Sequence, residues 1–466
     1  MDKDLKKTKE FLKNHFSIDK CFDIIEKDIV IGDRKGYFLM IDGLLNDAAM
    51  GGVINVLQRF APKKLNKTSI EELMNQFINF PETEITDDFD QIETMFLSGA
   101  IILFLDKETK AIIIDAREYQ VRGMNEPELE KVTRGSRDGF VETVVFNTSL
   151  IRRRIRNPNL MFEHTNVGVQ SKTDVVVTYI KGLANQEYVD FINKELDSID
   201  VPSLIMAEKT LVELLIPKQW YNPLPKVRFT ERPDVAAANL LEGHVLVIVD
   251  TSPSVIIFPV TMFSFLQHAE DYYHHPVIGT YTRLIRFFAT LAAFILIPLW
   301  YLLILYEGVI PDALKWMIPG NDSNVHFFFQ LLFLQFGIDL LQISSIHTPN
   351  ALAMPLGIVA GIVLSDFAIS AGYLSPEAIL AVAVVGLCTF AIPSSEFSYG
   401  IRKLSIFLFI LTAIFRLPGF IIGLIICFII TLTTKNNSKY RYTWPLIPFN
   451  WKALKYVLFR FPFKNK

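Results

Sequence analysis

Residues Phe287–Tyr306, FFATLAAFILIPLWYLLILY, form a run of 20 residues without a charged side chain. A helix needs about 20 apolar residues to cross roughly 30 Å of hydrocarbon, so this stretch predicts a membrane-spanning helix. Further apolar stretches follow at Val325–Ser345, Ala351–Gly372, Ala378–Ser394 and Leu404–Thr434. The C-terminal part of the chain is therefore predicted to be an α-helical, polytopic membrane domain.

The last of these stretches is too long for one straight span. Leu404–Thr434 has 31 residues, and the sequence Arg416-Leu417-Pro418-Gly419 interrupts it near the middle. At about 1.5 Å per residue a single helix would extend beyond the hydrocarbon layer. We expect either a kinked span or a tight pair of helices.

Flanking charges predict that both chain ends lie in the cytosol. The loop Glu307–Asn324 carries three acidic residues and one lysine, whereas Arg283 and Arg286 precede the first apolar stretch. The tail after Thr434 carries eight Lys and Arg residues and no acidic residue. Because basic residues accumulate on the cytosolic side, an even number of crossings, four or six, is expected.

The N-terminal part has the composition of a soluble protein. Residues 1–286 contain 34 Lys+Arg and 42 Asp+Glu, a net charge of −8, whereas residues 287–466 contain 12 and 7, a net of +5. The opening MDKDLKKTKE has no apolar core, so we expect no signal peptide and a cytosolic N-terminal part. Three cysteines lie too far apart to suggest a disulfide framework or a zinc site, namely Cys21, Cys388 and Cys427.

Two α/β (or α+β) subdomains are predicted before the membrane, at residues 1–130 and 131–280, followed by a transmembrane domain at 285–435 and a basic-aromatic tail at 436–466. Strand-like apolar runs lie at Gly36–Asp42, Ala100–Asp106, Ala111–Ala116, Thr173–Ile180, His244–Asp250 and Ser254–Val260. Helical spacing marks Lys7–Lys27, Leu44–Phe60, Asp138–Ile155, Asn185–Ser198 and the segment between Pro233 and Gly243. The acidic stretch Glu82–Asp90 is predicted to be a loop.

A dense group of arginines ends the predicted helix Asp138–Ile155, and it comprises Arg152, Arg153, Arg154 and Arg156. Cations are favourable at a helix C-terminus because of the helix dipole. The group could pair with acidic residues, within the chain or at a cytosolic contact between subunits; it could bind a lipid headgroup or another anion; or it could bind nucleic acid. The net negative charge of the soluble part counts against nucleic acid, and we favour the pairing with acids, including a subunit contact.

The sequence gives no sign of an enzyme or of a cofactor. No Gly-Lys-Ser/Thr follows Gly135 and Gly139, so a phosphate-binding loop is absent from that region. A cluster just before the first apolar stretch could be a metal site or a structural juxtamembrane segment, and it comprises His268, Glu270, Asp271, His274 and His275. Because the histidines lack the spacing of a helical zinc site, we favour the structural role and expect no metal.

Ionisable residues within the apolar stretches are the best candidates for function, namely Asp339, Asp366, Glu396 and Arg416. A charge at the bilayer centre costs about 2.5–3.5 kcal/mol on insertion scales, so such residues face protein or water. Asp339 or Asp366 could form an internal ion pair with Arg416, or these residues could line an ion pathway; an interfacial position is a third possibility.

Two further features concern the membrane domain. Gly357, Gly361 and Ser365 recur at four-residue spacing, which allows helices to pack closely within one subunit or between subunits. The tail Pro448–Phe463 mixes lysines and an arginine with aromatic residues, and this composition predicts a segment on an anionic cytosolic lipid leaflet. An RNA-binding tail has the same composition, but we favour the lipid leaflet because the tail follows a membrane domain.

Several motifs resemble the A-subunit family of bacterial spore germinant receptors, the GerA type. They are RGSRDGFVETVVFNTSLIRRRI at 134–155, ERPDVAAANLLEGHVLVIVDTSPSVIIFP at 231–259, AEDYY at 269–273, TPNALAMPLGIVAGIVLSDFAISAGYLSP at 348–376 and FAIPSSEFSYGIR at 390–402. The motif AEDYY is similar to the stage V sporulation AF branch of that family. The resemblance covers residues 130 to 430, and the region before it matches poorly.

The resemblance implies a cytosolic part of two subdomains, several membrane helices and assembly with other germination membrane proteins. Our first hypothesis is therefore a homo-oligomeric channel that releases monovalent cations across the spore inner membrane. The alternative is a non-conducting receptor or scaffold subunit that passes a germination signal to partners. A secondary transporter is a third class, but the membrane half has no evident internal repeat.

Overall fold

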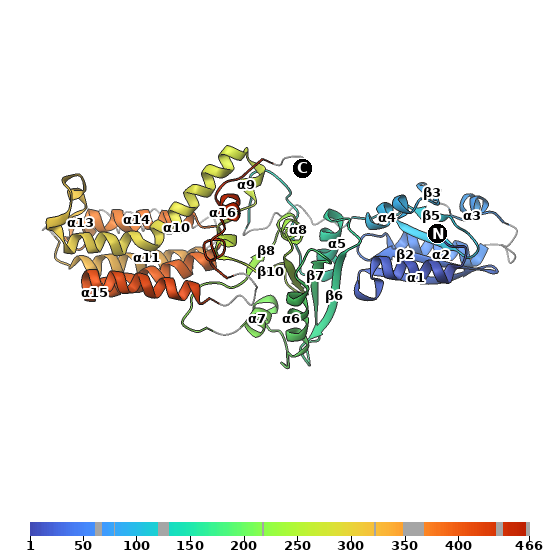
Figure 1. Ribbon diagram of the computed structural model, residues 1–466, viewed down its shortest axis with the longest axis horizontal. Helices are drawn as coiled ribbons and strands as arrows, with labels where there is room; N and C mark the ends of the chain where they lie inside the picture. Colours follow the sequence, from blue (N-terminus) through green and yellow to red (C-terminus); the bar gives the residue numbers. More distant parts are fainter. Residues whose placement is uncertain are drawn as a thin grey trace. The chain divides into compact units, whose positions relative to one another are not determined.

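A computed structural model of the chain describes residues 1–60, 68–78, 80–119, 130–216, 219–320, 323–347, 368–434 and 441–462. The chain forms two compact units (Figure 1). The first comprises Met1–Lys218 and Val227–Pro259, and the second comprises Gln219–Lys226 and Val260–Lys466. The two units have different compositions and are described separately.

The first unit contains two five-stranded antiparallel sheets. The first sheet has the order β1-β2-β4-β5-β3, with bounds Ile24–Ile31, Arg34–Ile41, Ile101–Leu105, Ala111–Ile114 and Thr83–Thr86. The second has the order β6-β7-β9-β10-β8, with bounds Leu160–Val167, Thr173–Ile180, Val245–Val249, Val255–Phe258 and Arg228–Thr230. In chain order the two sheets have the same topology, so the unit is a structural repeat.

Helices pack on these sheets at corresponding places in the two halves. In the first half they are α1 (Leu5–Phe16), α2 (Asp47–Phe60), α3 (Ile70–Phe77) and α4 (Phe89–Leu97). In the second half they are α5 (Val144–Arg154), α6 (Gln186–Asp197), α7 (Ala207–Leu215) and α8 (Pro233–Leu241). The fold class expected from the sequence, a two-part α/β or α+β N-terminal region followed by a helical region with apolar helices, is confirmed, and the antiparallel sheets make the two parts α+β.

Local signals explain some element boundaries and mislead at others. Proline begins α8 and Gly243, with a φ of 89°, follows its C-cap, as the asymmetry of helix ends predicts. The predicted helix Lys7–Lys27 is wrong beyond Phe16, because Ser17 adopts a left-handed conformation and β1 follows. The loop predicted at Glu82–Asp90 is also wrong, because it contains β3, which pairs with β5.

Two hydrophobic cores hold the first unit. One lies between α2, α3 and one face of the first sheet and includes Phe38, Leu57 and Leu103. The other is continuous across both halves and includes Phe16 and Phe96 from the first half and Val177 from the second. Because apolar residues occupy both faces of the central strands, β4 and β5 are buried at every position.

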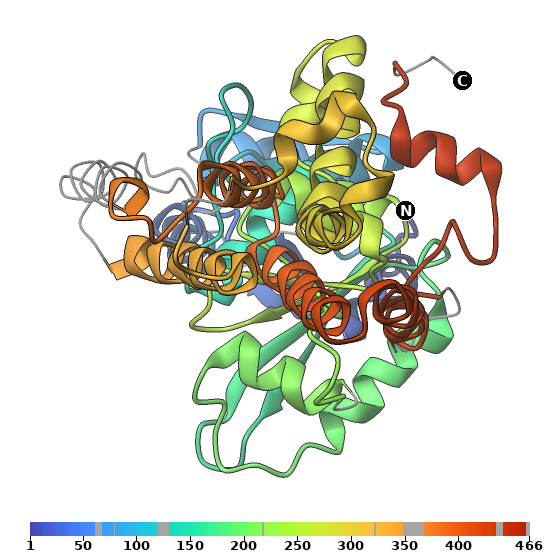
Figure 2. The same cartoon turned by 90° about the vertical axis from the view of Figure 1, so that its left-hand side faces the viewer.

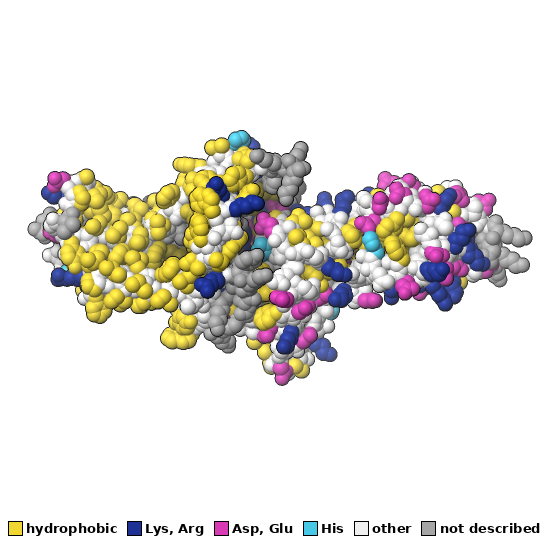
Figure 3. Space-filling view, in the orientation of Figure 1, with side chains coloured by type: hydrophobic (Ala, Val, Ile, Leu, Met, Phe, Trp, Pro, Cys, Tyr) yellow, Lys and Arg dark blue, Asp and Glu magenta, His cyan; other side chains and the backbone are white. Residues whose placement is uncertain are grey.

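The second unit is a helical bundle. Its long elements are α10 (Pro276–Leu305), α11 (Phe327–His347), α14 (Pro376–Phe390) and α15 (Ser395–Leu432), and Figure 2 shows them nearly end-on. Short elements complete it, namely η3 (Met262–Leu266), α9 (Glu270–Tyr273), η4 (Glu307–Val309), η5 (Asp312–Met317), α13 (Ala368–Ser370) and α16 (Trp451–Leu458). In Figure 3 hydrophobic side chains cover almost all of the visible surface around α10, α14 and α15.

The helix α15 is a tight hairpin rather than one straight rod. Arg416 has a φ of 56° and a ψ of −136°, which are not helical, and the chain reverses there. A Cβ atom added to Gly419 would lie 2.0 Å from the carbonyl oxygen of Leu411, so the two halves approach more closely than any larger residue allows. The sequence left a kinked span and a tight pair open, and the structure has the tight pair.

Contacts along the hairpin show that its two halves run antiparallel. A Cβ atom on Gly423 would lie 2.6 Å from Cδ1 of Leu408. The Cys427 thiol lies 3.9 Å from the carbonyl oxygen of Leu404. Residues later in the second half therefore contact residues earlier in the first half, which is the contact pattern of two antiparallel helices.

The directions of the other helices follow from contacts at their ends. At one end of the bundle, Phe265 stacks on Phe397 at the start of α15, and Arg286 near the start of α10 donates to the carbonyl of Leu266. At the other end, the rings of Tyr301 and Phe409 are 5.3 Å apart. The helix α10 and the first half of α15 are therefore parallel and begin at the same end.

Candidate functional site: an ion pair beside a cavity in the helical unit

Asp339 and Arg402 form an ion pair between α11 and the first half of α15. The distance between Nη1 of Arg402 and Oδ1 of Asp339 is 3.0 Å. Nη2 of Arg402 donates to the backbone oxygen of Gln335 at 2.6 Å, and Nη1 donates to Oε1 of Gln342 at 3.4 Å. Arg402 lies about two turns into α15 and Asp339 lies in the second half of α11, and many of the neighbouring side chains are apolar.

The sequence of α11 explains why the arginine is held so firmly. Gln335 and Asp339 are one helical turn apart, so the backbone oxygen of one and the carboxylate of the other face the same neighbour. Arg402 is 5% exposed, and a guanidinium in an apolar bundle is very unfavourable without a counter-charge and further acceptors. These acceptors offset that desolvation.

One side of the pair faces a cavity of about 1080 Å³. The side chain of Asp339 is 29% exposed, and it contributes to the cavity wall, whereas Arg402 lies behind it. The polar part of the wall also includes Gln330, Tyr399 and Lys403, and the rest is mainly aromatic and aliphatic. The site thus combines a neutralised carboxylate with a large apolar space.

The structure corrects the partner expected for Asp339. Arg416, named from the sequence as its candidate partner, is exposed at the reversal of α15 and is not bonded to it. Arg402 was missed because the amino-acid sequence does not indicate which of several basic residues faces α11. Glu396 lies exposed in the first turn of α15. The remaining candidates from the apolar stretches lie outside the described residues, namely Asp366, Gly357, Gly361 and Ser365.

The four arginines of the 152–156 group have separate environments in the first unit. Arg152 is 1% exposed and donates from Nε and Nη2 to the carboxylate of Asp23, at 2.9 and 3.1 Å. Arg153 is exposed, and its guanidinium lies 4.7 Å from the centre of the Tyr119 ring. The last of the group, Arg156, is exposed.

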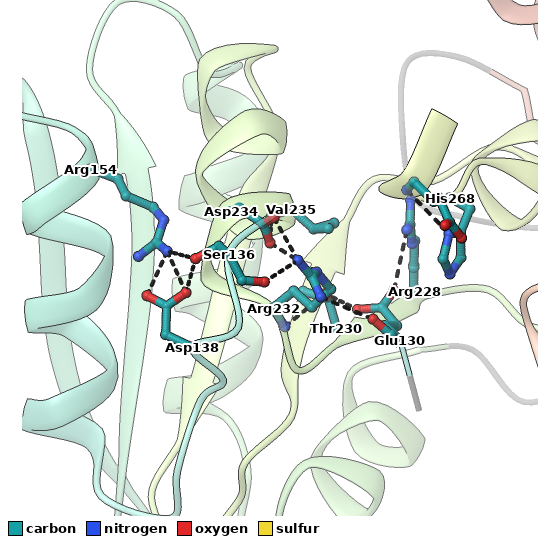
Figure 4. Close-up of polar contacts among 11 residues, drawn as sticks. Glu130, Ser136, Asp138, Arg154, Arg228, Thr230, Arg232, Asp234, Val235 and His268 are labelled. Atoms are coloured by element: carbon teal, nitrogen blue, oxygen red, sulfur yellow. Dashed lines mark hydrogen bonds and ion pairs between the residues drawn. The ribbon is translucent and has the colours of Figure 1, made fainter. Parts of the chain in front are cut away.

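Arg154 joins two of the motifs quoted from the sequence. It donates to Asp138 at 2.6 Å and to Ser136 at 2.8 Å (Figure 4). Arg232, fully buried, pairs with Asp234 at 2.9 Å and donates to the backbone oxygen of Ser136 at 2.8 Å. The segment at 134–138 is thus held from both sides, which explains why both motifs are rich in charge.

A second charged cluster lies at the start of α10. Asp271 is 1% exposed and accepts hydrogen bonds from Arg286 at 2.9 Å and Arg283 at 3.2 Å. The C-terminal tail joins this cluster, because Arg283 also donates to the backbone oxygen of Tyr456 at 3.2 Å. The sequence placed Asp271 in a juxtamembrane cluster but did not identify the arginines as its partners.

Comparisons with known proteins agree with these motifs. The family model described as Bacillus/Clostridium GerA spore germination protein matches residues 10–466. Stage V sporulation protein AF of Bacillus subtilis (strain 168) is 39% identical over 454 residues, which is 97% of this chain and 92% of that protein. Spore germination protein KA of the same organism is 29% identical over 94% of this chain and 81% of its own length.

A solved structure is also similar. The crystal structure of the N-terminal domain of the A subunit of the Bacillus megaterium spore germinant receptor GerK3 is 24% identical, with a TM-score of 0.43. The match covers 55% of this chain and 95% of that domain. With the family model matching nearly the whole length, this chain belongs to the GerA family of spore germination proteins.

Proposed function

We propose that this chain is a multi-pass membrane subunit of a spore germination complex, and that it forms a homo-oligomer that releases monovalent cations across the spore inner membrane. Family membership supports the role in germination. Other germination membrane proteins are its proposed partners, and it acts without catalysis and without a cofactor.

The helical unit has the dimensions that membrane insertion requires. The 30 residues of α10 extend for about 45 Å, which exceeds the thickness of a hydrocarbon core. On the face that Figure 3 shows, hydrophobic side chains cover most of the surface around α10, α14 and α15, as lipid contact demands. The start of α10 carries Arg283 and Arg286, so this end of the bundle is assigned to the cytosol together with both termini.

The observation that carries the proposal is the Asp339–Arg402 pair beside the cavity. A carboxylate lining a pore attracts cations, and rings of carboxylates select them in cation channels. While Arg402 is bound, the pair has no net charge and attracts cations only weakly. A shift of α15 relative to α11 would free the carboxylate, so the pair is suited to a closed state.

Potassium flux from liposomes tests this proposal. The full chain is reconstituted, and the wild type is compared with Asp339→Asn and with the control Asp312→Asn. Asp312 is a suitable control because it lies in η5 and its side chain is 92% exposed. We expect flux through the wild type and the control and altered flux or cation selectivity in Asp339→Asn. No flux in any oligomeric state would contradict the proposal.

The second candidate is a non-conducting receptor or scaffold subunit. It is favoured by the same ion pair, because Arg402 ties α11 to α15 through a carboxylate and a backbone oxygen. Such a lock predicts that Asp339→Asn lowers stability or partner assembly and leaves permeation unchanged. Thermal unfolding and single-channel recording of the same variant distinguish the two candidates.

A further inference from the structure

The cavity beside Asp339 is a long groove along one face of α11. Its wall includes Val325 near one end of the helix and Ile343 near the other, with the rings of Phe329, Phe333 and Phe336 between them. Ile343 lies 18 positions after Val325 in the sequence, which corresponds to about 27 Å along a helix. A space of this length with an aromatic wall suits an extended apolar chain better than a compact polar ligand.

Two hydrogen-bond donors lie at one end of the groove. Tyr399 and Lys403 are one helical turn apart on α15, and both line the cavity. They belong to the first turns of this helix, at the end of the bundle where α10 also begins. The two donors are therefore close to the end that the proposed topology assigns to the cytosolic leaflet.

The charge at this end of the groove is not balanced. Arg402 neutralises Asp339, so among the described residues of the wall the ammonium group of Lys403 is the charge that remains. Lys403 makes no hydrogen bond or ion pair with any residue in the part of the chain that the structure describes. A lysine on an apolar membrane helix is unfavourable unless an anion or water meets it, so this position calls for an anion.

A buried amide provides an independent observation. Gln335 is 4% exposed and lines the groove, and its Oε1 is buried without a hydrogen-bond partner among the described residues. A buried amide oxygen without a donor is unfavourable, and a half turn of the amide group exchanges the positions of its oxygen and its nitrogen. A ligand with an ester carbonyl or a hydroxyl would satisfy it.

We propose that the groove between α11 and α15 binds one anionic phospholipid of the cytosolic leaflet. Its phosphate lies against Lys403 and Tyr399, its polar linker reaches Gln335, and one acyl chain lies along the phenylalanines of α11. Basic pockets between membrane helices on the cytosolic side are the usual sites for such headgroups. The inference rests on the membrane insertion in the proposed function but not on ion conduction.

Charge and shape decide against other occupants. A free phosphate would meet Lys403 but would leave the aromatic wall uncovered. A helix from a second copy could cover that wall. If the second copy used the same mainly apolar groove face of α11 and α15, it would not provide an anion that matches Lys403. An anionic lipid satisfies the ammonium group, the amide and the apolar wall at once.

Native mass spectrometry of the full chain tests the proposal. The protein is delipidated in detergent and mixed with equal amounts of phosphatidylglycerol and phosphatidylcholine. We expect the wild type to retain phosphatidylglycerol preferentially and Lys403→Met to retain at least tenfold less. The control is Lys315→Met, because that lysine pairs with Asp312 in η5, and it should behave like the wild type.

Further variants keep the outcome interpretable. Lys403→Arg preserves the charge and should retain the lipid, which separates loss of binding from loss of folding. Equal retention by Lys403→Met and the wild type would overturn the proposal, as would equal retention of the two lipids or full displacement by inorganic phosphate. Disulfide cross-linking between copies through a cysteine at Phe333 would overturn it in favour of a helix–helix contact.

The test is separable from that of conduction. Asp339→Asn leaves Lys403 and Tyr399 in place, so we expect it to retain phosphatidylglycerol whatever its effect on potassium flux. Lys403→Met therefore tests lipid binding, and Asp339→Asn tests ion conduction, so that either proposal can fail without the other.

Discussion

Replacing Arg152 with methionine tests how the two halves of the first unit are held together. Arg152 lies on α5 of the second half and Asp23 precedes β1 of the first half, and their side chains are 1% and 2% exposed. Beside this pair, the backbone N–H of Phe22 donates to the oxygen of Phe162 at 3.2 Å. The ion pair is therefore the charged centre of the contact between the halves.

The loss of stability expected for Arg152→Met follows from the burial of the Arg152–Asp23 ion pair. Removing one partner of a buried pair leaves the other charge uncompensated, which costs about 3–5 kcal/mol. The Arg152 guanidinium also lies 4.9 Å from the centre of the Phe162 ring, a contact that methionine only partly replaces. Since about 1.4 kcal/mol is a factor of ten, protection around this contact should fall by roughly 100-fold or more.

Hydrogen exchange by mass spectrometry on the full chain in detergent measures this loss. We expect faster exchange in β1 and β6, where the two halves meet, in Arg152→Met. Arg153→Met is the matched control, because Arg153 is exposed and its contact with Tyr119 contributes only about 0.5–1 kcal/mol. The double variant Asp23→Leu with Arg152→Met should recover most of the protection, because an apolar pair carries no buried charge.

Equal exchange in Arg152→Met and Arg153→Met would refute this reasoning. It would mean that apolar packing alone holds the halves together and that the buried pair contributes nothing beyond its volume. Failure of the double variant to recover would instead refute the electrostatic explanation and point to lost packing.

Three further predictions concern other contacts. Asp271→Asn should lower the thermal unfolding temperature in detergent, because it leaves the arginines at the start of α10 without their counter-charge. Gly419→Leu should disrupt the α15 hairpin and abolish a single monodisperse peak in size-exclusion chromatography. Gly337→Leu should not, because a Cβ atom there would have no contact within 4 Å among the described residues. Burial lowers the pKa of His244 below its usual 6.5. The unfolded chain then binds the proton first as the pH falls, so protection of β9 against hydrogen exchange should decrease below about pH 6.5 in the wild type and less in His244→Gln.

Local pattern predicted the elements that depend on neighbouring residues. The uncharged run that forms most of α10 was evident from length and hydropathy, because crossing a membrane demands a long apolar helix. The break at Arg416 was evident from the proline and glycine that follow it. The strands β2, β4, β5 and β7 were evident as short apolar runs, because buried strands concentrate such residues.

Pairing between distant segments was not predictable in this way. The two sheets repeat the same strand order, and this repeat is not evident from the amino-acid sequences of the two halves. Strands β1 and β3 were missed because neither is a continuous apolar run. Three charged residues, Glu26, Lys27 and Asp28, interrupt β1, and β3 has only four residues, of which Ile85 alone is apolar. Their pairing with β2 and β5 identifies them.

Hydropathy and charge along the chain were enough to separate an acidic first part from an apolar helical second part, and the motifs were enough to identify the family. The tertiary structure decided which charges meet: Arg402 rather than Arg416 with Asp339, and Asp23 with Arg152. The physical reason is that hydropathy and helix periodicity act over a few turns of chain. An ion pair depends on the direction and rotation of two helices, which the packing of the whole unit sets.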